Sequence, residues 1–179
     1  MKENKTRKIV FIALYVAIAI TLDYIKEFLP FLNMKAGGSI NIALIPIVVA
    51  SFHLGVKNGI ITGLMWWLLS FVLGLNKWFI CLPQYLLDYI IPSGIIGISS
   101  LFYHHKKTRE IVFGIILMMF IRTLSIVISG VYYWPGELAS GSKAALIYSL
   151  SYNLPYSIAT CIILAMLVPI ILKTLKNVL

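Results

Sequence analysis

Charge is scarce in this 179-residue chain, of which only 12% is Asp, Glu, Lys or Arg. Apolar residues make up 60% of the chain, and its mean hydropathy is +0.95. A soluble domain of this composition would leave too much apolar surface in water. Cysteine is also rare: Cys81 and Cys161 lie in apolar stretches without CxxC spacing, as expected of small core residues. We therefore expect residues 1–179 to form one integral membrane domain.

Catalytic signatures are missing as well. The sequence has no HExxH, GxSxG or Walker A motif, and its three histidines lack the spacing of metal ligands. These absences argue against an enzyme, a metal site and a bound cofactor. A pump built on this chain would need separate subunits to hydrolyse ATP.

Apolar runs predict an all-α membrane protein with six transmembrane helices. Most of the runs reach the roughly 20 residues that a helix needs to cross a bilayer. The second run is short and carries Pro46, which makes its limits uncertain. The predicted spans are residues 9–28, 39–55, 57–75, 78–102, 111–134 and 145–172.

Lysine and arginine are unequally shared between the two sets of span ends. One set holds ten: Lys2, Lys5, Arg7, Lys8, Lys57, Lys106, Lys107, Arg109, Lys173 and Lys176. The opposite set holds four: Lys26, Lys35, Lys77 and Lys143. By the positive-inside rule, both termini are expected in the cytoplasm. The net charge of +9 is then explained by topology and by anionic lipid, with no need for nucleic acid.

Small residues recur every fourth position in two spans. Gly55, Gly59 and Gly63 do so at the start of the third span, and Ala13 and Ala17 in the first. Such faces let helix backbones approach closely in lipid. Packing within the chain is the simpler interpretation, whereas docking of a second membrane protein is the sharper alternative for the alanines.

Asp88 is the most informative single residue, because it lies in the apolar run CLPQYLLDYIIP. Counted from Trp78 at 1.5 Å per residue, it lies roughly 15 Å into a hydrocarbon core of about 30 Å. An ionised carboxylate at that depth costs several kcal/mol unless a cation or hydrogen-bond donors meet it. Asp88 therefore predicts either a structural pair or a binding site.

Polar and aromatic residues gather at a similar depth near the outer side. Gln84 is an i,i+4 neighbour of Asp88 and should share its helix face. Tyr148 and Asn153 lie about 140° apart on an ideal helix, so both would face one site only if Pro155 bends that helix. The other members of the group are Trp78, Tyr85, Tyr89 and Trp134. An acidic, aromatic pocket of this kind suits an organic cation with a flat ring, although Trp78 and Trp134 are equally well explained as interfacial anchors.

Two other charged residues in the predicted spans, Arg122 and Asp23, can be explained without a ligand. Arg122 should lie at a depth comparable to that of Asp88, so the two residues would form a structural ion pair. Asp23 lies near the outer end of the first span and is expected to reach water.

Several segments together resemble one family over nearly the whole chain. They are IALYVAIA in the first span, GGSINIALIPI at 37–47, LGVKNGIITGL at 54–64, QYLLDYIIP at 84–92, RTLSIVISGVYYW at 122–134 and YSLSYN at 148–153. Their order and spacing are similar to those of the thiamine-specific S-components of energy-coupling factor (ECF) vitamin transporters.

The resemblance implies a high-affinity thiamine-binding subunit of a bacterial cell membrane importer, with its pocket on the outer face. The loop between the first two spans would cover that pocket. A transmembrane coupling subunit and two ATPase subunits would be its partners, and the docking face would be Ala13 and Ala17. The ligand residues would be Trp78, Asp88, Tyr89, Trp134, Tyr148 and Asn153, with Arg122 as the family's cation.

The chain departs from the family pattern at particular positions. Ile126 stands where the family usually has a histidine, and Asp88 is one methylene shorter than the usual glutamate. A thiamine precursor or a related cationic ring compound is therefore an alternative substrate. Two other classes are a proton-coupled carrier that works alone through Asp88 and an assembly protein in which Asp88 and Arg122 only lock the bundle.

Overall fold

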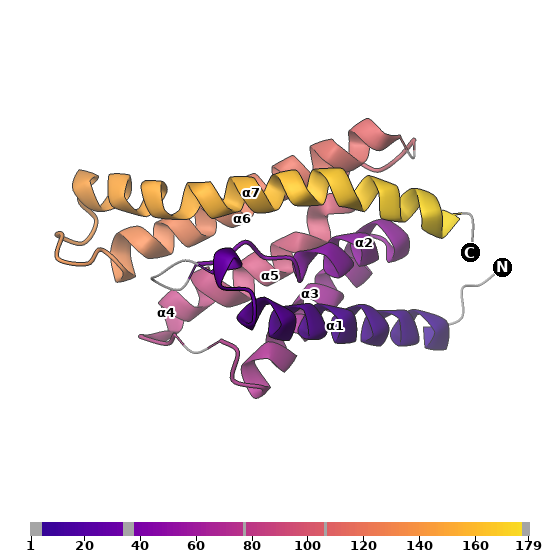
Figure 1. The fold of residues 1–179 in the computed structure, drawn as a ribbon, viewed down its shortest axis with the longest axis horizontal. Helices are drawn as coiled ribbons and strands as arrows, with labels where there is room; N and C mark the ends of the chain where they lie inside the picture. The colour runs from indigo at the N-terminus through magenta and orange to yellow at the C-terminus, as the bar shows by residue number, and fades with distance from the viewer. Residues whose placement is uncertain (1–4, 34–37, 77, 106, 177–179) are drawn as a thin grey trace.

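Helices lie side by side in an elongated bundle (Figure 1). This computed structural model describes residues 5–33, 38–76, 78–105 and 107–176. Within these ranges, pairing of the strand type is limited to one isolated bridge between Asn33 and Ser39. In chain order the elements are α1 (Lys5–Glu27), the 3₁₀ turn η1 (Pro30–Leu32), α2 (Leu44–Leu54), α3 (Val56–Val72), α4 (Leu82–Tyr85), the π-helical η2 (Leu86–Ile90), α5 (Ile91–Ile95), the 3₁₀ turn η3 (Ile96–Ser100), α6 (Thr108–Tyr133) and α7 (Lys143–Lys176).

Six helical stretches in the described part of the chain follow the six predicted spans. By length and composition, α1, α6 and α7 could cross a membrane, whereas α2 and α3 are apolar but shorter. The fourth stretch is a composite, because α4, η2, α5 and η3 follow one another without a break. The expectation of an all-helical protein is confirmed, and the uniform fourth helix over 78–102 is replaced by this segmented one.

The second span begins later than its apolar run predicts. Helix α2 starts at Leu44 and not near residue 39, because the Asn41 side chain accepts a hydrogen bond from the backbone of Ala43 (3.1 Å) and forms a local turn. Pro46 then falls in the first turn of α2, where backbone N–H groups have no partner within the helix. Pro46 therefore helps to begin α2 and does not kink it.

Glycines bring α2, α3 and the composite stretch into close contact. A Cβ atom on Gly59 would lie 2.7 Å from the Cβ of Ser51, and one on Gly63 would meet the carbonyl of Ser93. The Ser51 hydroxyl fills the same space with a bond to the carbonyl of Gly97 (2.7 Å). Gly59 and Gly63 of the third span thus serve packing within the chain, as small residues do between membrane helices, whereas Gly55 forms the turn between α2 and α3 with a positive φ of 86°.

Helix α1 has one buried face and one exposed face. Tyr15, Val16 and Ala19 are buried against the rest of the bundle, whereas Ala13 and Ala17 are exposed. The alanine pair therefore takes no part in packing within the chain.

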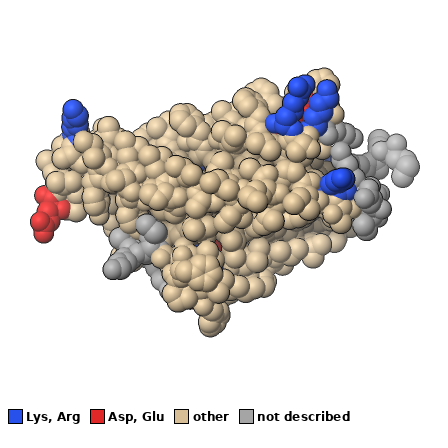
Figure 2. All heavy atoms as spheres, turned by 45° about the horizontal axis from the view of Figure 1, so that its top comes forward, with Lys and Arg blue, Asp and Glu red and all other residues tan. Residues whose placement is uncertain are grey.

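The start of α1 and the end of α7 lie at the same end of the bundle (Figure 1). We call the other end, where Tyr133 closes α6 and Lys143 opens α7, the α6–α7 end. On the face drawn in Figure 2, the Lys and Arg side chains occur near the two ends and a broad band between them has none. Of the residues counted for topology, Lys2, Lys35, Lys77 and Lys106 lie outside the described ranges.

Close packing at Gly97 gives a test of this fold. A Cβ on Gly97 would overlap the backbone of Ile60, whereas one on Gly94 would meet only the end of the Leu64 side chain at 3.6 Å. Gly97→Ala should therefore lower the Tm of the detergent-purified protein by about 3–10 °C, from an overpacking cost of about 1–3 kcal/mol. Gly94→Ala is the matched control and should leave Tm nearly unchanged. Equal Tm values for the two variants would contradict this packing.

Candidate functional site

The Asp88 carboxylate is held by neutral donors from two helical segments. Its Oδ2 atom accepts hydrogen bonds from Gln84 Nε2 (2.6 Å) and from the indole Nε1 of Trp134 (2.9 Å). Gln84 is fully buried, and its Oε1 accepts the backbone N–H of Ile80 at 3.0 Å. These bonds provide the hydrogen-bond donors that a carboxylate needs in an apolar region.

Asp88 lies in the π-helical turn η2, a distortion that the apolar run alone did not predict. Pro92 comes four residues later and has no N–H to donate to the carbonyl of Asp88. Its ring also crowds that carbonyl, so the regular i→i+4 pattern cannot pass this point. The D-x-x-x-P spacing was the sequence signal for the altered helix. The Ser125 hydroxyl of α6 donates a hydrogen bond to the carbonyl of Leu87 (2.8 Å) and so holds the widened turn against α6.

Two tryptophans meet beside Asp88 although they are far apart in sequence. The ring centroids of Trp78 and Trp134 are 6.0 Å apart, with ring planes at 88°. Trp78 is 57% exposed, whereas Trp134 is partly buried. An edge-to-face pair beside a carboxylate can form one wall of a site for a flat cation, because aromatic faces attract positive charge.

A second aromatic group packs behind the same turn. Tyr89 stacks at a tilt on Tyr85 with centroids 4.7 Å apart, and Tyr85 meets Trp67 of α3 at 6.3 Å. The Tyr85 hydroxyl and the Trp67 indole N–H are both buried without a hydrogen-bond partner among the described residues. The i,i+4 tyrosines were visible in the sequence, but the contribution of Trp67 was not.

Asn153 of α7 belongs to a separate polar group. It is 5% exposed, and its Nδ2 donates to the carbonyl (2.8 Å) and the hydroxyl (3.2 Å) of Ser149. Its Oδ1 accepts the hydroxyl of Tyr156, a neighbour that the sequence analysis did not select. Gly130 of α6 faces this group, since a Cβ there would strike the Ser149 hydroxyl and approach Asn153 Nδ2 to 3.4 Å.

Tyr148 does not join Asn153 in this structure. Its side chain is 44% exposed, whereas Asn153 is buried, as their angular separation on a regular helix requires. Helix α7 continues through Pro155 without interruption. The structure thus brings together Trp78, Gln84, Asp88 and Trp134, with Tyr89 beside them.

Arg122 does not meet Asp88. Among the described residues no ion pair within 4.0 Å joins them, and the buried Nε of Arg122 has no hydrogen-bond partner. The bonds from Trp134 and Gln84 to Asp88 replace the ion pair that comparable depth suggested.

Asp23 is buried, contrary to the expectation that it reaches water. It is 5% exposed and accepts hydrogen bonds from the Trp66 indole (2.7 Å) and from Lys26 Nζ (3.3 Å). A lysine one turn away and an indole from α3 supply the donors, so the carboxylate stays inside the bundle. This second aspartate–indole pair joins α1 to α3.

The connection before α2 rests on α7 next to Asn153. The backbone N–H of Gly38 donates to the Tyr152 hydroxyl (2.8 Å), and that of Asn41 donates to Thr160 Oγ1 (3.1 Å). A Cβ on Gly38 would lie 2.6 Å from the Tyr156 ring, so only glycine allows this approach. Residues 34–37 of the predicted covering loop lie outside the described ranges.

Known proteins resemble this chain over nearly its whole length. The sequence profile of the family described as thiamine transporter protein (Thia_YuaJ) matches residues 9–179. The thiamine transporter ThiT of Bacillus subtilis is 34% identical over 183 residues, which cover 96% of this chain and 93% of that protein. A solved structure of ThiT from Listeria monocytogenes superposes with a TM-score of 0.79 at 22% identity and covers 98% of both chains, which supports the fold. The chain therefore belongs to the thiamine transporter protein family, a family of transport proteins and not of enzymes.

Proposed function

We propose that this protein is the thiamine-binding S-component of an ECF-type, ATP-driven vitamin importer. The observation that carries the proposal is the half-buried Asp88 carboxylate, hydrogen-bonded by Gln84 and Trp134 and flanked by the Trp78 ring. Membership of the chain in the thiamine transporter protein family supports thiamine as the substrate.

The chemistry of the cluster suits thiamine, which carries a cationic thiazolium ring and an aminopyrimidine ring. Both protein donors reach Oδ2 of Asp88, so that Oδ1 can accept a hydrogen bond from the ligand's amine. The Trp78 and Trp134 rings can contact the cationic ring at about 0.5–2 kcal/mol each. Tyr148, which the family resemblance also assigns to the site, is exposed in this structure.

Orientation in a bacterial cell membrane belongs to the same proposal. The start of α1 and the end of α7 share one end of the bundle (Figure 1), and these two segments contain the counted basic residues Lys5, Arg7, Lys8 and Lys173. The positive-inside rule assigns this end to the cytoplasm. Asp88 and Trp134 then belong to the outer half, from which thiamine would be captured.

Energy would come from partner subunits. The exposed Ala13 and Ala17 lie among exposed apolar side chains of α1, including Leu14 and Ile18, and suit close docking of a coupling-subunit helix. Two ATPase subunits would complete the importer. A proton-coupled carrier that works alone is the competing possibility, and it would transport thiamine in vesicles without these partners.

The ligand cluster is tested by thiamine titration of detergent-purified protein, followed by calorimetry and by tryptophan fluorescence. Asp88→Asn keeps the shape of the side chain but removes its charge, and should raise the Kd for thiamine by about 10–150-fold, the equivalent of a charged hydrogen bond worth about 1.5–3 kcal/mol. Trp134→Ala should also weaken binding, because it removes both a ring and a donor to Asp88.

Asp23→Asn is the matched control for the charge, because Asp23 is a buried aspartate that also accepts an indole N–H. The Kd of Asp23→Asn for thiamine should stay within a factor of about two of the Kd of the parent protein, as expected for an independent position. Equal effects of the two substitutions would argue against a ligand role for Asp88. Binding of a pyrimidine or thiazole precursor in place of thiamine would keep the site and change the substrate, a result that Ile126 in place of the family's histidine would explain.

The docking face is tested by separating binding from transport. Ala17→Leu places a bulky side chain on the exposed face of α1, so thiamine uptake into vesicles with the ECF module should fall while Kd stays unchanged. Ala144→Leu, at an exposed position in the first turn of α7, is the control and should preserve both. Uptake that survives Ala17→Leu, or that needs no module, would contradict the proposed partnership.

A further inference from the structure

Two adjacent cavities lie between α6 and α7. The first has a volume of about 270 Å³ and the second about 330 Å³, and both are lined by Leu124 and Val127. We call the two together the α6–α7 groove. It is separate from the Asp88 cluster, since none of the residues that surround Asp88 lines it.

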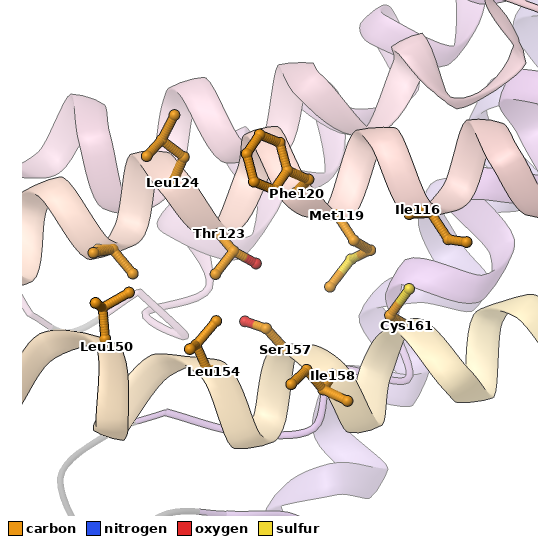
Figure 3. Close-up of a pocket in the computed structure, with 11 residues that line it drawn as sticks. Ile116, Met119, Phe120, Thr123, Leu124, Leu150, Leu154, Ser157, Ile158 and Cys161 are labelled. Carbon is orange, nitrogen blue, oxygen red and sulfur yellow. The ribbon is translucent and has the colours of Figure 1, made fainter.

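The first cavity is almost entirely apolar (Figure 3). Its apolar walls include Phe120 and Leu124 of α6 and Leu154 and Ile158 of α7, which are 39–66% exposed. Hydroxyl groups occur at one level only, where Thr123 and Ser157 point toward each other from opposite helices (Figure 3). The groove therefore opens sideways, toward the hydrocarbon that surrounds a membrane-spanning bundle.

The second cavity extends the groove to the α6–α7 end and changes its chemistry there. Lys143 and Ser142 line it together with Tyr132. The Ser142 hydroxyl caps α7 by accepting the N–H of Ala145 (3.1 Å), so the positive end of that long helix adds to the lysine charge. Glu137, on the same connection, is exposed and forms no ion pair within 4.0 Å with Lys143 among the described residues. This end of the groove favours an anion.

The length of the groove matches one leaflet of a bilayer. Lys143 and Ser157 are roughly 21 Å apart along α7 at 1.5 Å per residue. Half of a bilayer, headgroups included, measures about 20–22 Å. A molecule with its anionic group at Lys143 would therefore end its apolar part near the hydroxyls of Thr123 and Ser157, at the middle of the membrane.

We propose that the α6–α7 groove binds one anionic phospholipid, with the phosphate at Lys143 and one acyl chain along Leu146, Val127 and Leu124 toward Ser157. An acyl chain restores the dispersion contacts that the groove walls lack between the two helices. The lysine and the helix start select the anionic headgroup through charge. The site does not depend on thiamine as the substrate.

The proposal is tested by native mass spectrometry of the full-length protein released from bilayers that contain equal amounts of phosphatidylglycerol and phosphatidylcholine. The parent should retain one phosphatidylglycerol in preference to phosphatidylcholine. Lys143→Gln should lose that preference, because the headgroup loses its cation. Leu154→Trp should lose the retained lipid altogether, because the larger side chain fills the first cavity.

Matched controls separate the groove from general effects. Lys57→Gln removes another exposed lysine, and Leu167→Trp enlarges another exposed leucine of α7 that does not line the groove. Both should retain the lipid as the parent does, and Tm measurements should show all four variants folded. Equal retention of the two lipids by the parent, or identical losses in the controls, would overturn the proposal, as would occupation of this face by a second copy of the chain. Thiamine affinity is measured in parallel and should be unchanged in Lys143→Gln and Leu154→Trp, so that failure here is distinct from failure of the proposed transport role.

Discussion

Satisfying the half-buried Asp88 carboxylate is the constraint on which the arrangement of this end of the bundle depends. A carboxylate away from water needs hydrogen-bond donors, and two neutral side chains provide them here, Gln84 one turn away and Trp134 from the end of α6. The second bond is between helices, so it holds the end of α6 against η2. It also fixes the position of the Trp134 ring, which then meets Trp78. One polar requirement thus positions the tryptophan pair.

The backbone around Asp88 also departs from a regular α-helix. Pro92 prevents the regular helical bond to the Asp88 carbonyl, and the chain responds with the π turn η2. Such turns widen a helix and change the directions of its side chains. This distortion lies at Asp88, within the candidate site. Elsewhere the bundle is packed more closely: Gly59 and Gly63 admit Ser51 and a backbone carbonyl of the composite stretch. The close packing of α2 and α3 against the composite stretch thus supports its irregular turn η2.

Much of the site could be predicted from spacing along a single helix. Gln84 and Asp88 are four residues apart and share a face, and the separation of Tyr148 from Asn153 also follows from the helical repeat. Contacts between helices could not be predicted in this way. Depth alone suggested Arg122 as the partner of Asp88, but depth does not specify which way a side chain points around the helix axis. The burial of Asp23 was missed for the same reason, because its donor Trp66 comes from another helix.

The sequence by itself determined the apolar character, the helical content, the approximate positions of the helices and the family, because apolar run length and residue order are properties of the chain read in one dimension. It also singled out Asp88, since an acid within an apolar run is conspicuous without any coordinates. Only the tertiary structure decided which donors meet that acid, where α2 begins, and that α6 and α7 leave a groove between them. These features depend on the rotation and separation of packed helices, which are set by contacts between residues far apart in the sequence.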